Sequence, residues 1–102
     1  MNMVNQLYDA VYYGSDLEFK YNDVYYFINA GMKSVNGADT HIINVSESTF
    51  SFYEGEPIGS SHEIYSSANV NPTVNTNKFF NEKIFDGQSL YEIINDIKEV
   101  NY

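Results

Sequence analysis

The spacing of hydrophobic positions changes within the first third of the chain. Apolar residues three and four positions apart predict an amphipathic helix over residues 3–13. Over residues 17–21 apolar and polar residues alternate, which is the pattern of a strand buried on one face. Asn22 and Asp23 suit a two-residue turn, and the aromatic and β-branched run at 24–28 predicts the returning strand. These patterns predict a helix followed by a β-hairpin.

The middle of the chain is less regular. Residues 29–40 contain Gly, Asn and Asp without periodicity, so a long surface loop is expected there. A second hairpin is predicted over residues 43–52, with its turn near residues 47–48. Two hairpins in succession indicate an antiparallel meander of about four strands. Residues 54–77 are rich in turn-forming residues and contain Pro72, so a flexible loop or insert is expected.

A capping box marks the start of a helix near the C-terminus. Ser89 and Glu92 have the spacing at which each side chain accepts a hydrogen bond from the other residue's backbone N–H. The apolar stripe of this helix, expected in the core, consists of Leu90, Ile93, Ile94 and Ile97. The prediction is a single α+β domain over residues 1–102. It has an N-terminal helix, the antiparallel meander, and C-terminal helices packed on one face of the sheet.

Composition narrows the function classes. The 102 residues carry 14 acidic side chains against five lysines and no arginine, which gives a net charge of −9. Such a chain cannot neutralise the phosphate backbone of a nucleic acid, so direct nucleic-acid binding is not expected. Without cysteine it has no disulfide, zinc–thiolate site or thiol nucleophile. The first residues lack the regions of a signal peptide, and no stretch approaches about 20 apolar residues, so a cytoplasmic protein without membrane contact is expected.

The sequence contains no motif that assigns an enzymatic reaction. It has no nucleophile elbow, glycine-rich phosphate loop or recognised metal-ligand spacing. His41 begins a predicted strand and His62 lies in a predicted loop, and both are expected to be solvent-exposed. A chain of this length has little material for a cleft in addition to its core. We therefore expect a protein that is not an enzyme, with no catalytic residue, metal or cofactor.

An acidic stripe on the predicted C-terminal helix is the first candidate binding surface. Glu92, Asp96 and Glu99 fall within about 60° of one another on a helical wheel, opposite the isoleucines. One interpretation is an ordinary solvated helix face. The other is a DNA mimic, a carboxylate surface that a basic groove accepts in place of a phosphate backbone.

The tyrosines are the second candidate. The chain has ten of them, more than a core of this size needs. Tyr25 and Tyr26 are neighbours on a predicted strand, so they point to opposite faces and cannot both be buried. Exposed tyrosine is common in protein interfaces, and we therefore include Tyr25, Tyr26 and Tyr53 in the candidate partner-binding set. Compositional drift, in a chain also rich in Asn and Ile, is the alternative explanation.

Two segments resemble a known group of proteins. Residues 17–28 read LEFKYNDVYYFI, and residues 86–97 read DGQSLYEIINDI. They are similar to a hairpin and a closing helix that recur in small uncharacterised proteins of Gram-positive bacteria and their phages. The chain departs from that group in two places. Asn22-Asp23 stands where the group prefers Asn-Gly, and the segment 54–77 is a long insert. In size, acidity and lack of catalytic motifs the chain also resembles phage inhibitors of host defence, including anti-CRISPR proteins.

The leading hypothesis for function is a non-enzymatic inhibitor that binds a larger basic protein, such as a nuclease complex of a host defence system. An immunity-type protein that neutralises a toxin would use the same acidic surface. A small enzyme or ligand-binding domain with a pocket in residues 29–40 or 54–77 belongs to a different class. A homodimer is compatible with each of these hypotheses.

Overall fold

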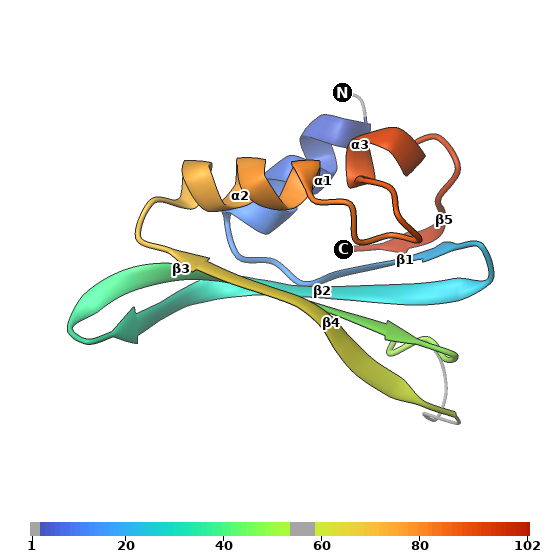
Figure 1. Cartoon of the computed structure of the whole chain (residues 1–102), viewed down its shortest axis with the longest axis horizontal. Helices are drawn as coiled ribbons and strands as arrows, with labels where there is room; N and C mark the ends of the chain where they lie inside the picture. Colours follow the sequence, from blue (N-terminus) through green and yellow to red (C-terminus); the bar gives the residue numbers. More distant parts are fainter. Residues whose placement is uncertain (1–2, 54–58) are drawn as a thin grey trace.

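One antiparallel sheet with helices on one face makes up the described part of the chain, residues 3–53 and 59–102 of the computed structural model. The strand order is β4-β3-β2-β1-β5 (Figure 1). The strands are β1 (Leu17–Tyr21), β2 (Val24–Val35), β3 (Ala38–Ser48), β4 (Ser61–Asn69) and β5 (Lys98–Asn101). The helices are α1 (Met3–Tyr12), α2 (Pro72–Asn81) and α3 (Leu90–Ile93). The predicted α+β class is confirmed, but β4 and β5 of the described sheet are not among the four strands of the predicted meander.

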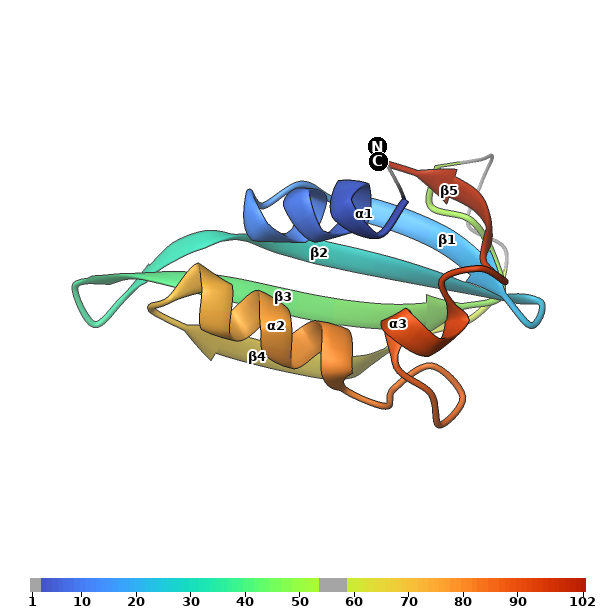
Figure 2. The same cartoon turned by 90° about the horizontal axis from the view of Figure 1, so that it is seen from above.

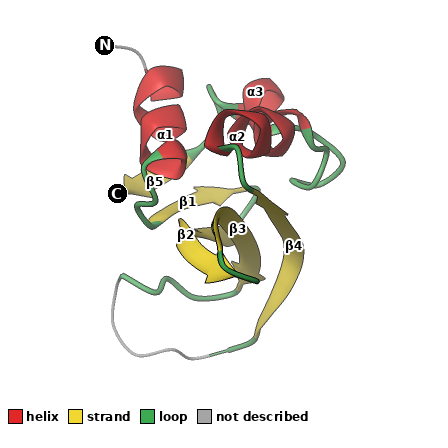
Figure 3. Cartoon of the chain, turned by 90° about the vertical axis from the view of Figure 1, so that its left-hand side faces the viewer, coloured by secondary structure: helices red, strands yellow, loops and turns green. Residues whose placement is uncertain are grey.

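The hydrophobic core lies between the sheet and its helices. Figures 2 and 3 show α1, α2 and α3 on the same side of the sheet. Alternate residues of the strands point to this side, so that Leu17 lies opposite Ile28, and Phe19 opposite Tyr26. Fully buried side chains from outside the strands meet them: Leu7, Val11, Phe79, Phe80, Phe85, Leu90 and Ile93. The other face of the sheet carries no helix of the described residues.

The first helix and the first hairpin form where the pattern predicts them. α1 ends at Tyr12, and Gly14 follows with a φ of 84°. A Cβ on Gly14 would lie 3.0 Å from the Cα of Gly31, so this close approach of α1 to β2 favours glycine. Asn22 and Asp23 have φ values of 51° and 62°, the positive values that a tight hairpin turn needs.

The second hairpin is longer than predicted and lies earlier in the chain. β2 and β3 pair in one continuous register as far as Val35 and Ala38, and the turn is Asn36-Gly37 with φ values of 52° and 82°. The loop expected at 29–40 is therefore wrong. Asn-Gly strongly favours a two-residue turn with positive φ at both positions, and this local signal outweighs the missing periodicity around it.

β3 continues through the position at which the sequence pattern predicts a turn. Residues 47–48 pair with β2 on one side and with β4 on the other. The residues after Ser48 form no strand as far as Tyr53, so the hairpin predicted over 43–52 is wrong. A strand with partners on both edges satisfies its backbone N–H and C=O groups only while it stays extended. That requirement carries β3 past the expected turn.

The segment 54–77, expected to be a flexible loop or insert, contains a strand and most of a helix. Residues 61–69 are β4, and α2 begins at Pro72. Asn71 caps this helix, because its side-chain oxygen accepts hydrogen bonds from two helical N–H groups at 3.0 and 3.3 Å. Proline at the first helical position needs no N–H partner, so Asn71-Pro72 starts a helix and the loop prediction is wrong there. Residues 54–58 lie outside the described residues.

The C-terminal helix is much shorter than predicted. The capping box between Ser89 and Glu92 is present, but α3 ends at Ile93 and the chain then turns into β5. β5 pairs with the outer edge of β1 and supplies partners for backbone groups that a longer helix would leave unpaired. Ile93 and Ile97 are buried as expected, whereas Ile94 is only partly buried.

Candidate functional site

The face of the sheet without helices holds a second set of cross-strand pairs. Glu18 of β1 lies opposite Phe27 of β2, and Lys20 lies opposite Tyr25. These positions alternate with the core positions, so their side chains point away from the helices. Figure 3 shows the helices on one side of the sheet and the green segment that directly follows β3 on the other. We call this surface the helix-free face.

Residues 49–53 follow β3 and cross β2 on the helix-free face, and we call them the aromatic strap. The ring centroid of Phe52 lies 4.9 Å from that of Phe27 and 4.9 Å from that of Phe50. The ring centroid of Tyr53 lies 6.2 Å from that of Phe27. Phe52 and Tyr53 are 47% and 46% exposed. The strap therefore presents two large aromatic rings to solvent above the sheet.

Glu18 ties the aromatic strap to β1. It is 0% exposed, and both of its carboxylate oxygens accept hydrogen bonds from the strap. Oε1 accepts from the Ser51 hydroxyl, and Oε2 accepts from the Phe52 N–H at 2.7 Å. The Ser51 oxygen accepts in turn from the Tyr53 N–H at 3.1 Å. Burying a carboxylate is unfavourable unless its oxygens are hydrogen-bonded, so Glu18 and the strap hold each other in place.

Two carboxylates act on Tyr53 of the aromatic strap. Burial raises the pKa of the Tyr53 hydroxyl above its ordinary value, and the Asp16 and Glu18 carboxylates add to this effect. On the same face the Lys20 Nζ lies 5.2 Å from the ring centroid of Tyr25, which is the geometry of a cation–π contact. The helix-free face thus combines aromatic rings with anionic groups.

Carboxylates from distant parts of the chain meet around the turn between β1 and β2. We call this region the acidic end, and its members are Asp23, Glu47, Asp86, Asp96 and Glu99. Asp23, Asp96 and Glu99 line a depression of about 330 Å³. Asp23 and Glu47 line a second one of about 200 Å³, which Thr49 of the aromatic strap also lines. The acidic end and the strap are therefore neighbours.

The predicted acidic stripe is wrong as a helical surface, because α3 is too short to carry it. Glu92 lies in α3, Asp96 lies in the turn that follows, and Glu99 lies in β5. Asp96 and Glu99 do come together, at the acidic end, where the Glu99 Oε2 lies 3.7 Å from the Lys20 Nζ. Only two members of the predicted stripe thus share a surface.

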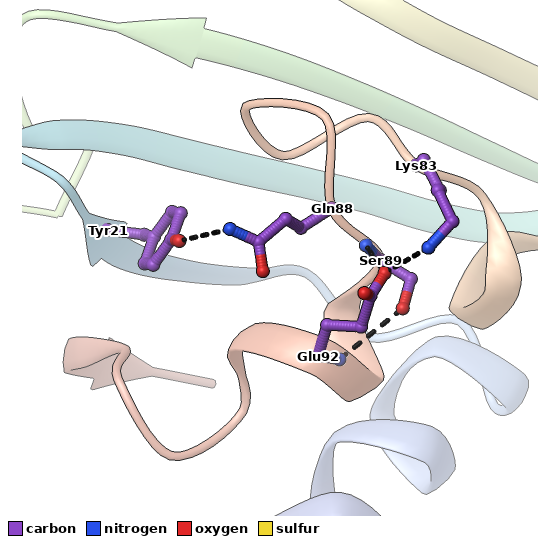
Figure 4. A network of polar contacts seen from close by, with 5 residues as sticks. All are labelled: Tyr21, Lys83, Gln88, Ser89 and Glu92. Atoms are coloured by element: carbon purple, nitrogen blue, oxygen red, sulfur yellow. Dashed lines mark hydrogen bonds and ion pairs between the residues drawn. The ribbon is translucent and has the colours of Figure 1, made fainter.

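Glu92 belongs to a structural network at the start of α3 (Figure 4). Its carboxylate pairs with Lys83 and accepts the Ser89 N–H at 2.9 Å, while the Ser89 Oγ accepts the Glu92 N–H at 3.3 Å. The bonds from Lys83 and from the Ser89 backbone lower the pKa of Glu92 to about 2. Beside them Gln88 donates to the Tyr21 hydroxyl at 3.2 Å. These contacts fix the C-terminal segment. Glu92 is therefore not counted among the residues of the acidic end.

The three candidate tyrosines lie in different environments. Tyr26 is in the core, 3% exposed, and burial is the main cause that raises its pKa to about 12. It is buried beneath the helices, so it is not part of the surface described here. Tyr25 is partly buried beneath Lys20, and Tyr53 is in the aromatic strap. The alternation places Tyr25 and Tyr26 on opposite faces as predicted, and the helices decide which of them is buried.

One of the two histidines is buried and the other is exposed. His41 was expected at the surface, which is wrong, because it is 0% exposed. The Asn75 Nδ2 donates to its Nδ1 at 3.0 Å, which leaves its Nε2 to donate to the Val11 carbonyl at 2.9 Å. The imidazole therefore joins β3 to both α1 and α2. The side chain of His62 is 65% exposed, as expected, and its Nε2 lies 2.8 Å from the Glu47 Oε1.

Two residues of the strap region were missed by the sequence analysis. The sequence does indicate a role for Phe27. Residues 24–28 are apolar or aromatic without interruption, so both faces of that strand must be apolar. No such pattern indicates Glu18. It meets Ser51 across β2 although the two residues are 33 positions apart in the chain, and no local pattern connects them.

Other kinds of site are not found in the described residues. Nowhere in residues 3–53 and 59–102 do three His, Asp or Glu side chains gather as a metal ion would require. No helix in this part of the chain has the length and hydrophobicity to cross a membrane. Comparisons of the chain with protein-family models, curated proteins and solved structures find no match. What the surface binds must therefore be inferred from its own geometry.

Proposed function

We propose that this chain is a non-enzymatic binding protein whose partner is a larger, basic protein. One observation carries the proposal: the acidic end adjoins the aromatic strap, through Thr49, in a chain of net charge −9. Protein interfaces commonly combine buried aromatic anchors with a charged rim. The two surfaces together have this composition.

The acidic end keeps an excess of negative charge. Lys20 and Lys98 line the larger depression, so two lysines face the five carboxylates of this region. Exposed charges act over about 10 Å at 0.1 M salt, and a surface of one sign accelerates encounter with a surface of the other. The carboxylates would therefore steer association, and the exposed rings of Phe52 and Tyr53 would slow dissociation.

A nucleic-acid-binding groove is the kind of basic surface that such carboxylates fit. Proteins that bind nucleic acid gather Lys and Arg where phosphates lie. Carboxylates fixed on a folded domain can take the place of those phosphates. As the partner class we propose a nucleic-acid-handling enzyme of a host defence system, which this protein inhibits by occupying its nucleic-acid site.

A capture and competition experiment tests this function. The immobilised protein captures partners from a nuclease-treated host lysate, so that nucleic acid cannot bridge the two. The captured protein is purified and loaded with a fluorescent duplex. Displacement of the duplex in proportion to added protein is expected. Simultaneous binding of duplex and protein would contradict inhibition by occupancy, and capture of a toxin without a nucleic-acid site would favour the immunity-type alternative.

Association kinetics with the captured protein test the acidic end. The triple variant Asp23→Asn, Asp96→Asn, Glu99→Gln removes three charges and keeps the side-chain sizes. We expect association to slow about tenfold or more at 0.05 M salt, within the range of electrostatic steering. The difference should nearly vanish at 1 M salt, where the Debye length is about 3 Å.

A matched variant controls for the overall charge. Asp9→Asn, Asp39→Asn and Glu82→Gln remove the same charge from α1, from the start of β3 and from the end of α2. This variant should slow association clearly less than the acidic-end variant does. Equal slowing by both would mean that only net charge matters, and it would rule out the acidic end as part of the interface.

A further inference from the structure

We propose that the aromatic strap is the site for an arginine side chain of the basic partner. This inference rests on the proposed function and names the group that is recognised. Three features support it: exposed aromatic side chains, nearby carboxylates that lack a cation, and a rigid attachment of the strap to the sheet.

The exposed rings of the strap suit the stacking of a planar cation. Phe52 and Tyr53 are 47% and 46% exposed, and the ring centroid of Phe27 lies 4.9 and 6.2 Å from theirs. A cation binds an aromatic ring when it lies within about 6 Å of the centroid, over the ring face. Nearly half of each of these two side chains is exposed, so a cation can approach them from solvent.

The carboxylates beside the strap favour a cation over an apolar group. Asp16 is exposed and forms no ion pair with any residue that the structure describes. Glu18 is held by two hydrogen bonds from the strap and has no described lysine as its partner. Both carboxylates act on Tyr53, where together with burial they raise the pKa of the hydroxyl. The Glu18 carboxylate is already satisfied by these hydrogen bonds, so an apolar side chain over the rings would leave the exposed Asp16 carboxylate without a counter-charge.

The helix-free face already holds one cation over a ring. The Lys20 Nζ lies 5.2 Å from the ring centroid of Tyr25, and Lys20 is on the same face of β1 as Glu18. That site is filled from within the chain. No lysine of the described residues lies over Phe52 or Tyr53 in the same way. The strap thus offers a similar site that a partner can fill.

Arginine fits the strap better than lysine does. Its guanidinium group is planar and more weakly hydrated than an ammonium group, so it stacks on a ring at less desolvation cost. It can also donate two parallel hydrogen bonds to a carboxylate such as Asp16. Because Glu18 fixes Ser51 and Phe52 before binding, little ordering of the strap is needed when the partner arrives.

A peptide titration followed by NMR tests the site without the natural partner. Capped tetra-arginine and tetra-lysine peptides carry equal charge, so the overall field of the protein attracts both alike. Binding curves taken from the ring resonances of Phe52 and Tyr53 should show about two- to fivefold tighter binding of the arginine peptide. Equal affinity for the two peptides, or no shift at these rings, would overturn the inference.

Two leucine variants locate the preference. Phe52→Leu keeps an apolar side chain but removes the ring, and the preference for arginine read at Tyr53 should fall towards one. Tyr13→Leu removes another exposed ring, 77% exposed and next to the end of α1, and should leave the preference unchanged. Amide spectra show whether both variants are folded. An unchanged preference in folded Phe52→Leu would refute the strap as the arginine site.

The outcomes separate this inference from the proposed function. If the arginine peptide shifts only residues of the acidic end, the arginine site is overturned, while duplex displacement still decides the inhibitory function. If the strap binds arginine but the protein does not displace the duplex from its captured partner, the proposed inhibition is refuted. The arginine site is then still supported.

Discussion

Replacement of His41 by leucine tests whether the buried imidazole fastens the helices to the sheet. Leucine has a similar size, so the change mainly removes hydrogen bonds. The Val11 carbonyl loses the Nε2 donor at 2.9 Å and keeps only the Gly14 N–H at 3.3 Å. The Asn75 amide loses its bond to Nδ1 and keeps the one to the carbonyl oxygen of residue 41 at 2.9 Å.

The expected loss follows from these bonds. A net intramolecular hydrogen bond contributes about 1 kcal/mol, and a buried polar group that loses a partner costs about 1–3 kcal/mol more when no water replaces it. His41 and Asn75 are 0% and 1% exposed, so water does not reach them easily. Since Val11 retains a second donor, we expect His41→Leu to lower the free energy of unfolding by about 2–3 kcal/mol. A domain of this size has about 5–15 kcal/mol in total, so the loss is large.

Urea unfolding followed by circular dichroism measures this loss, and His62→Leu is the matched control. The side chain of His62 is 65% exposed, and its contact with Glu47 should contribute less than about 1 kcal/mol. In the double variant His41→Leu, Asn75→Leu the two effects should fall short of additivity by about 1 kcal/mol. If His41→Leu cost no more than His62→Leu at an unchanged m-value, the buried network would not stabilise the fold as argued.

Three further predictions concern the stability of the fold. Two compare a buried side chain with a less buried one, and the third concerns the paired carboxylate of Glu92. In urea unfolding, Phe85→Ala should cost about 3–5 kcal/mol because its ring is fully buried, and Phe52→Ala about 1 kcal/mol or less; equal losses would place the strap in the core. Ile93→Ala should cost about 2–5 kcal/mol and Ile94→Ala clearly less, and the reverse order would contradict the short α3. The pKa of Glu92 is about 2 in the folded protein, below that of the unfolded chain, so its stabilisation is present above pH about 4.5 and is lost as the pH falls towards 2. Glu92→Gln should remove this part of the acid dependence of unfolding, and an identical pH profile would contradict the pairing.

Elements decided by neighbouring residues could be predicted from the sequence. The helix expected over residues 3–13 and the hairpin over 17–28 formed as predicted, because periodicity and turn residues act within a few positions. The capping box of Ser89 and Glu92 is equally local. Asn36-Gly37 carried a turn signal of the same kind, but it was overlooked because the flanking residues are exposed and do not alternate.

The candidate site was much less predictable, because its parts meet only through the sheet. Asp96 and Glu99 were identified for their charge, and they share a surface because β5 returns to β1, not because a helix carries them. Tyr53 was identified for its residue type alone. Its partners, Phe27 and Glu18, lie on β2 and β1, and only the order of the strands brings them beneath the strap.

The sequence by itself determined the α+β class, the strongly acidic charge, the starts of α1 and α3 and the first hairpin. These features depend on residue types and on spacings of a few residues, which keep their preferences whatever the rest of the chain does. The tertiary structure decided that Tyr26 is buried and Tyr25 is not, that β4 pairs with β3, and that α3 ends after one turn. Each of those outcomes depends on contacts between segments far apart in the chain. Such contacts stabilise the fold only once the sheet has assembled, so they cannot be predicted from any short stretch of the sequence.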